Sequence, residues 1–138
     1  MKISVVDGSS YFKGLLLLLR KDKKVTSAEI DLMKRIGKTL GFEREFCDHA
    51  ISEILDNTFI VDIPHVFYTK ELTMKFVMDG LAVAFSDNEI HPLEEQWLRS
   101  TVEINGLDVE WFSREKENMV NRKRIPGHLE VDDLTVTY

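Results

Sequence analysis

Acidic side chains that could hold a divalent cation gather in two short segments of this sequence. In the later segment, Asp87, Glu89 and Glu94 offer carboxylates, and Asn88 adds an amide oxygen. Calcium and magnesium prefer oxygen ligands of this kind, about six to eight for calcium and a tight octahedron for magnesium. Backbone carbonyls and water would complete the coordination. The segment therefore predicts a divalent-cation site, although it lacks the central glycine of the EF-hand loop.

The earlier segment supplies Asp22 and Glu29 as the corresponding candidates. Three lysines, Lys21, Lys23 and Lys24, flank Asp22 and would repel a cation. The later segment is therefore the better candidate for metal binding. Apart from such a cation, the sequence predicts no cofactor.

The same acidic residues also have a structural interpretation. Thr26 followed three residues later by Glu29 is a capping box, in which the glutamate accepts a hydrogen bond from the N–H of the capping residue. Glu94 would reach back to the N–H of His91 in the same way, and Asp87 would bind turn amides. Both interpretations stay open, and capping is favoured because short metal-like motifs carry a high false-positive risk.

Other chemically capable side chains are better explained by packing or exposure. Glu45, His49 and Glu53 are spaced four apart and would share an exposed helix face. Cys47 lies among apolar helix positions, which predicts a buried, inert thiol. No zinc-protease, phosphate-loop, dinucleotide or nucleophile-elbow motif occurs. The sequence thus predicts no catalytic residue and a protein that is not an enzyme.

An internal repeat organises the chain around the two acidic segments. A single offset of 65 residues superimposes one segment on the other without a gap. Repetition at a fixed spacing predicts a duplicated structural unit, here a helical hairpin. The matched pairs are Asp22 with Asp87, Val25 with Ile90, Glu29 with Glu94, Gly41 with Gly106, Phe42 with Leu107, and Phe46 with Trp111.

Apolar periodicity and capping residues predict an all-α bundle of about six helices in two pseudo-equivalent halves. The chain is expected to be one domain over residues 1–138, with halves at about 11–57 and 69–120 and a tail at 122–138. Gly80 is expected to permit close approach of another helix. The predicted elements are helices at about 11–21, 27–40, 43–56, 70–85, 92–105 and 109–120, with a β-prone linker at 59–67.

The two ends of the chain carry weak strand signals. Ile3, Val5 and Val6 favour a short strand, and residues 7–10 favour a turn before the first helix. Apolar residues recur at mostly even spacing over residues 129–138. These segments predict a small β ribbon made from the termini.

The repeated element resembles the TerB family of tellurite-resistance proteins, and also the N-terminal region of DjlA-type co-chaperones. In this element an aspartate is followed after two residues by Val25 or Ile90, and after three more residues by a glutamate. An apolar helix precedes the element. The helix that follows it ends in Leu40-Gly41-Phe42 or Asn105-Gly106-Leu107. The resemblance covers about residues 11–120. It implies a compact helical module without catalytic activity that acts in stress or metal/tellurite response through protein–protein interaction. It also implies metal binding at the acidic loops.

Charge and composition narrow the kinds of partner. The net charge is −6, which argues against a general nucleic-acid binder because no basic excess exists to neutralise phosphates. Residues 1–40 carry nine basic and four acidic side chains, whereas residues 41–112 carry four basic and fifteen acidic ones. A protein partner is expected, and a homodimer is also compatible with the sequence. The alternative function is a divalent-cation binder that uses the acidic loop of the second repeat.

Cysteine usage and hydropathy predict a cytoplasmic protein. Cys47 is the only cysteine, so no internal disulfide can form. The apolar run at residues 15–19 is far shorter than the roughly 20 residues that span a bilayer, which predicts no direct membrane insertion. The N-terminal residues also lack the plan of a signal peptide.

Overall fold

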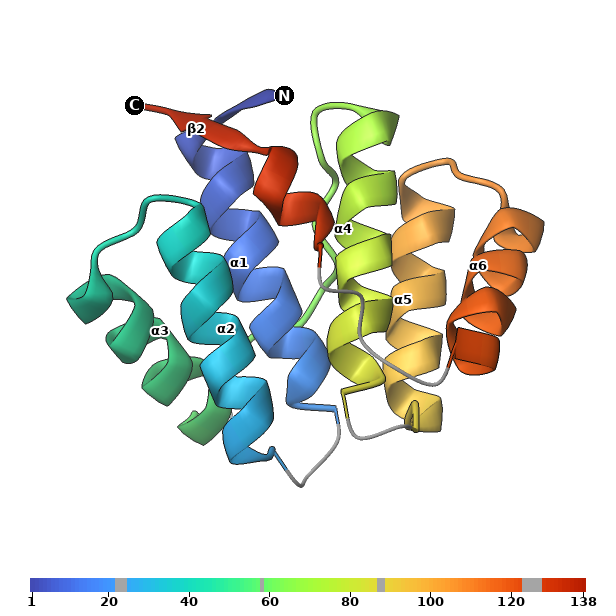
Figure 1. Cartoon of the computed structure of the whole chain (residues 1–138), viewed down its shortest axis with the longest axis horizontal. Helices are drawn as coiled ribbons and strands as arrows, with labels where there is room; N and C mark the ends of the chain where they lie inside the picture. The colour runs from blue at the N-terminus through green and yellow to red at the C-terminus, as the bar shows by residue number, and fades with distance from the viewer. Residues whose placement is uncertain (22–24, 58, 87–88, 123–127) are drawn as a thin grey trace.

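In the computed structural model of this chain, six α-helices pack as a bundle and the two ends form a short β ribbon (Figure 1). The predicted all-α fold with a ribbon from the termini is confirmed. The structure describes residues 1–21, 25–57, 59–86, 89–122 and 128–138. In chain order the elements are β1 (Lys2–Ser4), α1 (Val5–Leu19), α2 (Ser27–Thr39), α3 (Arg44–Asp56), α4 (Lys70–Ala84), α5 (Pro92–Ile104), α6 (Val109–Arg122), the 3₁₀ helix η1 (Glu130–Asp133) and β2 (Thr135–Thr137).

The helices of the two halves follow one another at the repeat offset. α1, α2 and α3 begin at Val5, Ser27 and Arg44, and α4, α5 and α6 each begin 65 residues after their counterparts. Just beyond α2 and α5, Gly41 and Gly106 have φ angles of 83° and 72°. Glycine adopts this left-handed conformation with the least strain, so both glycines end their helices as the sequence predicts.

Capping side chains fix where α2 and α5 begin. The hydroxyl of Thr26 accepts a hydrogen bond from the N–H of Glu29 at 3.2 Å, and the Glu29 carboxylate accepts one from the N–H of Thr26 at 2.9 Å. Nδ1 of His91 accepts from the N–H of Leu93 at 3.1 Å, and Glu94 accepts from the N–H of His91 at 3.0 Å. Both predicted capping arrangements are confirmed, and they satisfy donors that a helix leaves open at its start.

The first helix begins earlier than the sequence predicts. The turn expected over residues 7–10 is instead part of α1, which begins at Val5 and not at Tyr11. Ser4 is the N-cap, because its hydroxyl accepts a hydrogen bond from the N–H of Asp7 at 3.1 Å. Neighbouring elements bury Asp7, so tertiary packing overrides the local turn preference. The expected first strand is correspondingly confined to β1.

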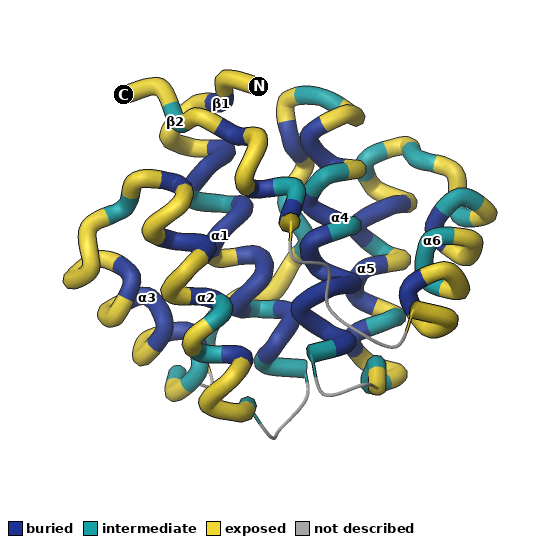
Figure 2. Tube along the Cα trace, in the orientation of Figure 1, coloured by how far each residue is buried: buried dark blue, intermediate teal, exposed yellow. Residues whose placement is uncertain are grey.

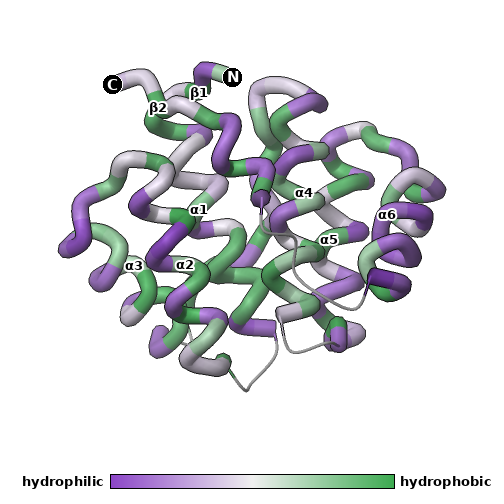
Figure 3. The backbone as a smooth tube through the Cα atoms, viewed as in Figure 1, coloured by the Kyte–Doolittle hydropathy of each residue, from purple (hydrophilic) through white to green (hydrophobic). Residues whose placement is uncertain are grey.

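α1 and α4 lie side by side at the centre of the bundle, and buried positions follow both helices (Figure 2). Four of the five leucines at residues 15–19 are at most 1% exposed, as expected for a helix buried on most sides. Hydrophilic residues gather on the outer helix α6 (Figure 3). A Cβ on Gly80 would lie 2.7 Å from Cδ2 of Leu98 and 3.2 Å from Cδ2 of Leu18, so the predicted close approach at this glycine is confirmed.

The last eleven residues fold back over the bundle and close it. β2 pairs with β1 in parallel, with Val136 opposite Ile3. Three side chains of this segment, Leu129, Val131 and Leu134, are at most 5% exposed. The tail is therefore part of the core and joins both ends of the chain.

A buried carboxylate on α4 holds the tail in place. Oδ1 of Asp79 accepts a hydrogen bond from the N–H of Glu130 at 2.7 Å, and Oδ2 accepts one from the N–H of Val131 at 2.8 Å. The hydroxyl of Tyr11 on α1 also donates to Oδ2 at 2.6 Å. Asp79 is 1% exposed, and burial raises the pKa of its carboxyl to about 6 although the three hydrogen bonds lower it.

The raised pKa of Asp79 makes stability depend on pH. In the unfolded chain an aspartate titrates near pH 3.9, so the folded state binds the additional proton between that pH and about 6. The contribution of Asp79 to the free energy of unfolding is complete below about pH 3.9 and is lost as the pH rises through about 6. We expect wild type to lose about 3 kcal/mol relative to Asp79→Asn between about pH 3 and about pH 7 in denaturant unfolding.

The control for this experiment is Asp31→Asn, which neutralises an exposed carboxylate on α2. Its stability should follow that of wild type across the same pH range. A constant difference between wild type and Asp79→Asn would contradict the prediction.

Candidate functional site

The structure places the described acidic candidates at the starts of helices or at the surface. Glu29 and Glu94 are 2% and 1% exposed and belong to the capping boxes, whereas Glu89 is exposed. Asp22 and Asp87 lie outside the described residues. Within the described residues, no three His, Cys, Asp or Glu side chains gather closely enough to hold a metal ion. The cation site therefore stays a prediction, since it requires Asp87.

The histidine and cysteine candidates on α3 lie where the sequence predicts. Nε2 of His49 is 2.9 Å from Oε2 of Glu53, and both side chains are exposed. Cys47 is 4% exposed. Burial, and then the charge of Asp48, raises the pKa of the Cys47 thiol, which keeps it protonated and weakly nucleophilic.

The segment that joins the two halves exposes large apolar side chains. Residues 59–68 run from α3 to α4 without forming a helix or a strand. Large apolar side chains that are exposed close together on a surface mark interaction sites. We call the following five side chains the linker surface: Phe59 (92% exposed), Val61 (72%), Ile63 (71%), Val66 (60%) and Tyr68 (90%).

Asn105, which ends α5, clamps the second half of this linker. Its Nδ2 donates a hydrogen bond to the carbonyl of His65 at 3.0 Å, and its Oδ1 accepts one from the N–H of Phe67 at 3.0 Å. The hydroxyl of Thr73 on α4 donates to the same Oδ1 at 3.1 Å. One amide side chain thus replaces the strand partner that this extended backbone lacks.

A second anchor holds the linker near its middle. Nε1 of Trp97 donates a hydrogen bond to the carbonyl of Asp62 at 2.7 Å. Lys21 forms a hydrogen-bonded ion pair with the Asp62 carboxylate, and this hydrogen bond lowers the pKa of Asp62. Trp97 is buried, and its hydrogen bond also fixes the linker. The linker surface is therefore presented by an extended segment that is fixed from its inner side.

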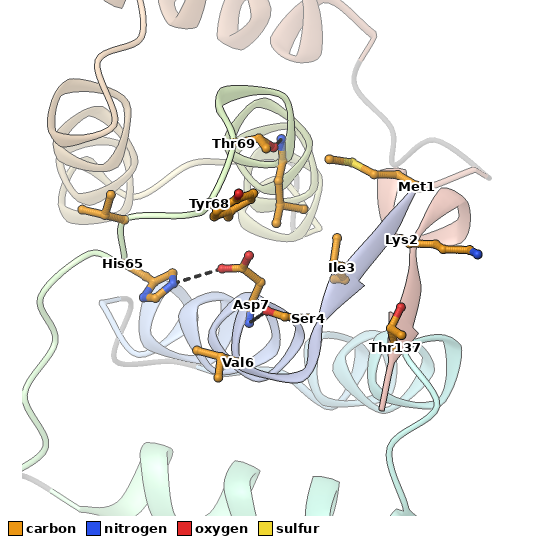
Figure 4. Close-up of a pocket in the computed structure, with 12 residues that line it drawn as sticks. Met1, Lys2, Ile3, Ser4, Val6, Asp7, His65, Tyr68, Thr69 and Thr137 are labelled. Atoms are coloured by element: carbon orange, nitrogen blue, oxygen red, sulfur yellow. Dashed lines mark hydrogen bonds and ion pairs between the residues drawn. The ribbon is translucent and has the colours of Figure 1, made fainter.

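A cavity of about 740 Å³ opens beside the end of the linker surface (Figure 4). β1, the first turn of α1 and the start of α4 form its walls. Asp7 is 7% exposed, and its Oδ1 lies 3.3 Å from Nε2 of His65. Val66 and Tyr68 belong both to this cavity and to the linker surface.

A second hollow of about 320 Å³ lies near the start of the linker, between α1 and α3. Its walls include Phe46, Ile54, Ile60 and Val61. Nζ of Lys13 lies 5.7 Å from the centre of the Phe46 ring, over its face. The linker surface therefore has a hollow near each of its ends.

The polar groups beside the cavity make structural contacts. In the described part of the chain, no nucleophile is hydrogen-bonded to His65, and the nearby hydroxyl of Ser4 caps α1. What the site offers is apolar area with one buried carboxylate. The sequence alone does not predict this site, because 58 residues separate Asp7 from His65 and no short-range spacing signals their contact.

Comparisons with known family models, curated proteins and solved structures gave no match. Among the described residues, none of the helices is both long and apolar enough to cross a membrane. The fold and the site together define the structural class of this protein: a six-helix bundle that exposes an apolar linker between two hollows.

The capping role of Glu94 is testable by substitution. We expect Glu94→Ala to lower the free energy of unfolding by about 1–2 kcal/mol, because the N–H of His91 loses its acceptor. Glu94→Gln keeps an acceptor oxygen and should recover most of that loss. Chemical denaturation measures both, with the exposed Glu103→Ala as control. If Gln were as damaging as Ala, the carboxylate charge would matter more than the cap.

The cation hypothesis is tested separately. If Asp87, Glu89 and Glu94 hold an ion, adding calcium, magnesium or zinc should raise the melting temperature and change tryptophan fluorescence. Asp87→Asn should abolish that response, whereas Asp31→Asn should leave it unchanged. The absence of a shift with all three ions would remove the hypothesis.

Proposed function

We propose that this chain is a non-catalytic, TerB-like interaction module that binds a protein partner through the linker surface. In this proposal it acts in the cytoplasm, in stress or metal/tellurite response. The repeated hairpin element supports the TerB-like part of the proposal. The lone, buried Cys47 supports a reducing compartment.

The observation that carries the proposal is the exposure of the linker surface. Its five side chains are 60–92% exposed, although the bundle buries large apolar side chains throughout its core. The inner side of the same segment is held by Asn105 and Trp97. A fixed apolar surface loses little conformational freedom on binding, which favours association.

The hollows suggest how a partner would fit. An apolar side chain from the partner would enter the space beside Ile60 and Val61, and a second partner side chain would enter the space beside Val66. Large side chains that fill pockets usually contribute most of the binding energy at an interface. The partner is therefore expected to insert a side chain at each end of the linker, with an apolar one beside Ile60 and Val61.

Photo-crosslinking tests the proposal. A photoreactive residue at Val61 should capture one defined protein in cells of the source organism, and the same residue at the exposed Val120 on α6 should not. Captured protein should increase when the cells are exposed to tellurite.

With the captured partner purified, the double variant Val61→Ser/Ile63→Ser should weaken its binding about tenfold or more. Stability should change by no more than about 0.5 kcal/mol per substitution, because both side chains are largely exposed. Val120→Ser is the matched control. Unchanged affinity of the double variant would contradict the proposal.

A further inference from the structure

The cavity beside the linker contains a buried carboxylate that points into it. In Figure 4 the carboxylate of Asp7 extends from α1 toward the open space, with His65 on one side and Tyr68 nearby. Oδ1 of Asp7 contacts His65, whereas Oδ2 has no hydrogen bond or ion pair within the described residues. Apolar wall is supplied by Ile3 and Leu72.

The charged groups around the cavity leave Asp7 as its main electrostatic feature. Within the described residues, no lysine or arginine pairs with Asp7. The side chain of Lys2 points away from the cavity (Figure 4), and the amine of Met1 donates to the carbonyl of Asp133 at 2.7 Å. An anion would be repelled by the Asp7 carboxylate, whereas a cation would find an acceptor in its Oδ2.

We infer that this cavity receives a lysine or arginine side chain of the protein partner. The inference rests on the proposed function and names the chemistry of the partner residue that enters the site. The ammonium or guanidinium group pairs with Oδ2 of Asp7, and the aliphatic stem lies against Ile3 and Leu72. The ring of Tyr68 lines the same space and adds cation–π attraction.

A metal ion fits the cavity less well than a basic side chain. Asp7 and His65 supply one carboxylate and one imidazole, whereas zinc and calcium sites use about four or more ligands. The apolar wall suits the carbon stem of a side chain. A cavity of about 740 Å³ is also larger than an ion requires.

Small model compounds test the inference without the partner. The probes are N-acetyl-lysine methylamide and N-acetyl-norleucine methylamide, which share a stem and differ in the ammonium group. In ¹H–¹⁵N spectra of the full chain, the lysine compound should shift the amides of Asp7, His65 and Leu72. The norleucine compound should bind about tenfold or more weakly. Equal binding of both compounds, or shifts elsewhere only, would overturn the inference.

Variants distinguish binding in the cavity from general electrostatic attraction of a cation to an acidic protein. Asp7→Asn should abolish the preference for the lysine compound, and Asp31→Asn, with the same change in net charge, should preserve it. Tyr68→Ala should weaken binding while leaving the fold intact, because that ring is 90% exposed. If Asp7→Asn does not fold, the wild-type shift map and Tyr68→Ala decide the question. The double variant Val61→Ser/Ile63→Ser should still bind the lysine compound, because neither side chain lines the cavity. The cavity and the linker surface are therefore tested separately.

Discussion

The buried carboxylate of Asp79 is the interaction on which the rest of the structure depends. It accepts two backbone N–H groups from η1 and the hydroxyl of Tyr11, so it joins the tail, α4 and α1 at one point. Three hydrogen-bond donors offset much of the free-energy cost of burying the carboxylate. Without them, an unpaired buried carboxylate would destabilise the fold. The surface pairs Lys75–Glu130 and Arg35–Asp132 lie nearby but contribute little, because they are partly exposed.

The position of the tail determines the shape of the site. Once η1 is fixed, β2 lies beside β1, and the strand pairing sets where α1 starts. Ser4 then caps α1, and Asp7 is directed into the cavity. The linker is held independently by Asn105, whose amide contacts backbone groups on both sides of Val66. The cavity therefore forms where two separately fixed segments meet.

The sequence predicts the elements that local chemistry decides and misses those decided by distant contacts. The capping boxes at Thr26 and His91 mark the starts of α2 and α5, because both partners lie within one turn. The predicted start of α1 was wrong, because residues 7–10 favour a turn locally. In the folded chain this segment packs against the tail and is helical. Asp79 and the Asp7–His65 pair join residues 51 to 68 apart, and no spacing rule connects such positions. The linker was predicted as a connection, but β-prone apolar residues give no sign of facing solvent.

Energetics explain why an apolar linker and a buried acid would work together. Covering the five linker side chains would gain on the order of 10 kcal/mol, from about 1.5–3 kcal/mol for each buried side chain. Association costs about 4–15 kcal/mol, so the apolar surface alone supports only a weak and unselective complex. A partner without a basic side chain would also seal Oδ2 of Asp7 from water without a hydrogen-bond donor, at a cost of about 1–3 kcal/mol or more. The same carboxylate that attracts a lysine or arginine thus penalises a purely apolar partner, which makes Asp7 the source of selectivity and the linker the source of affinity.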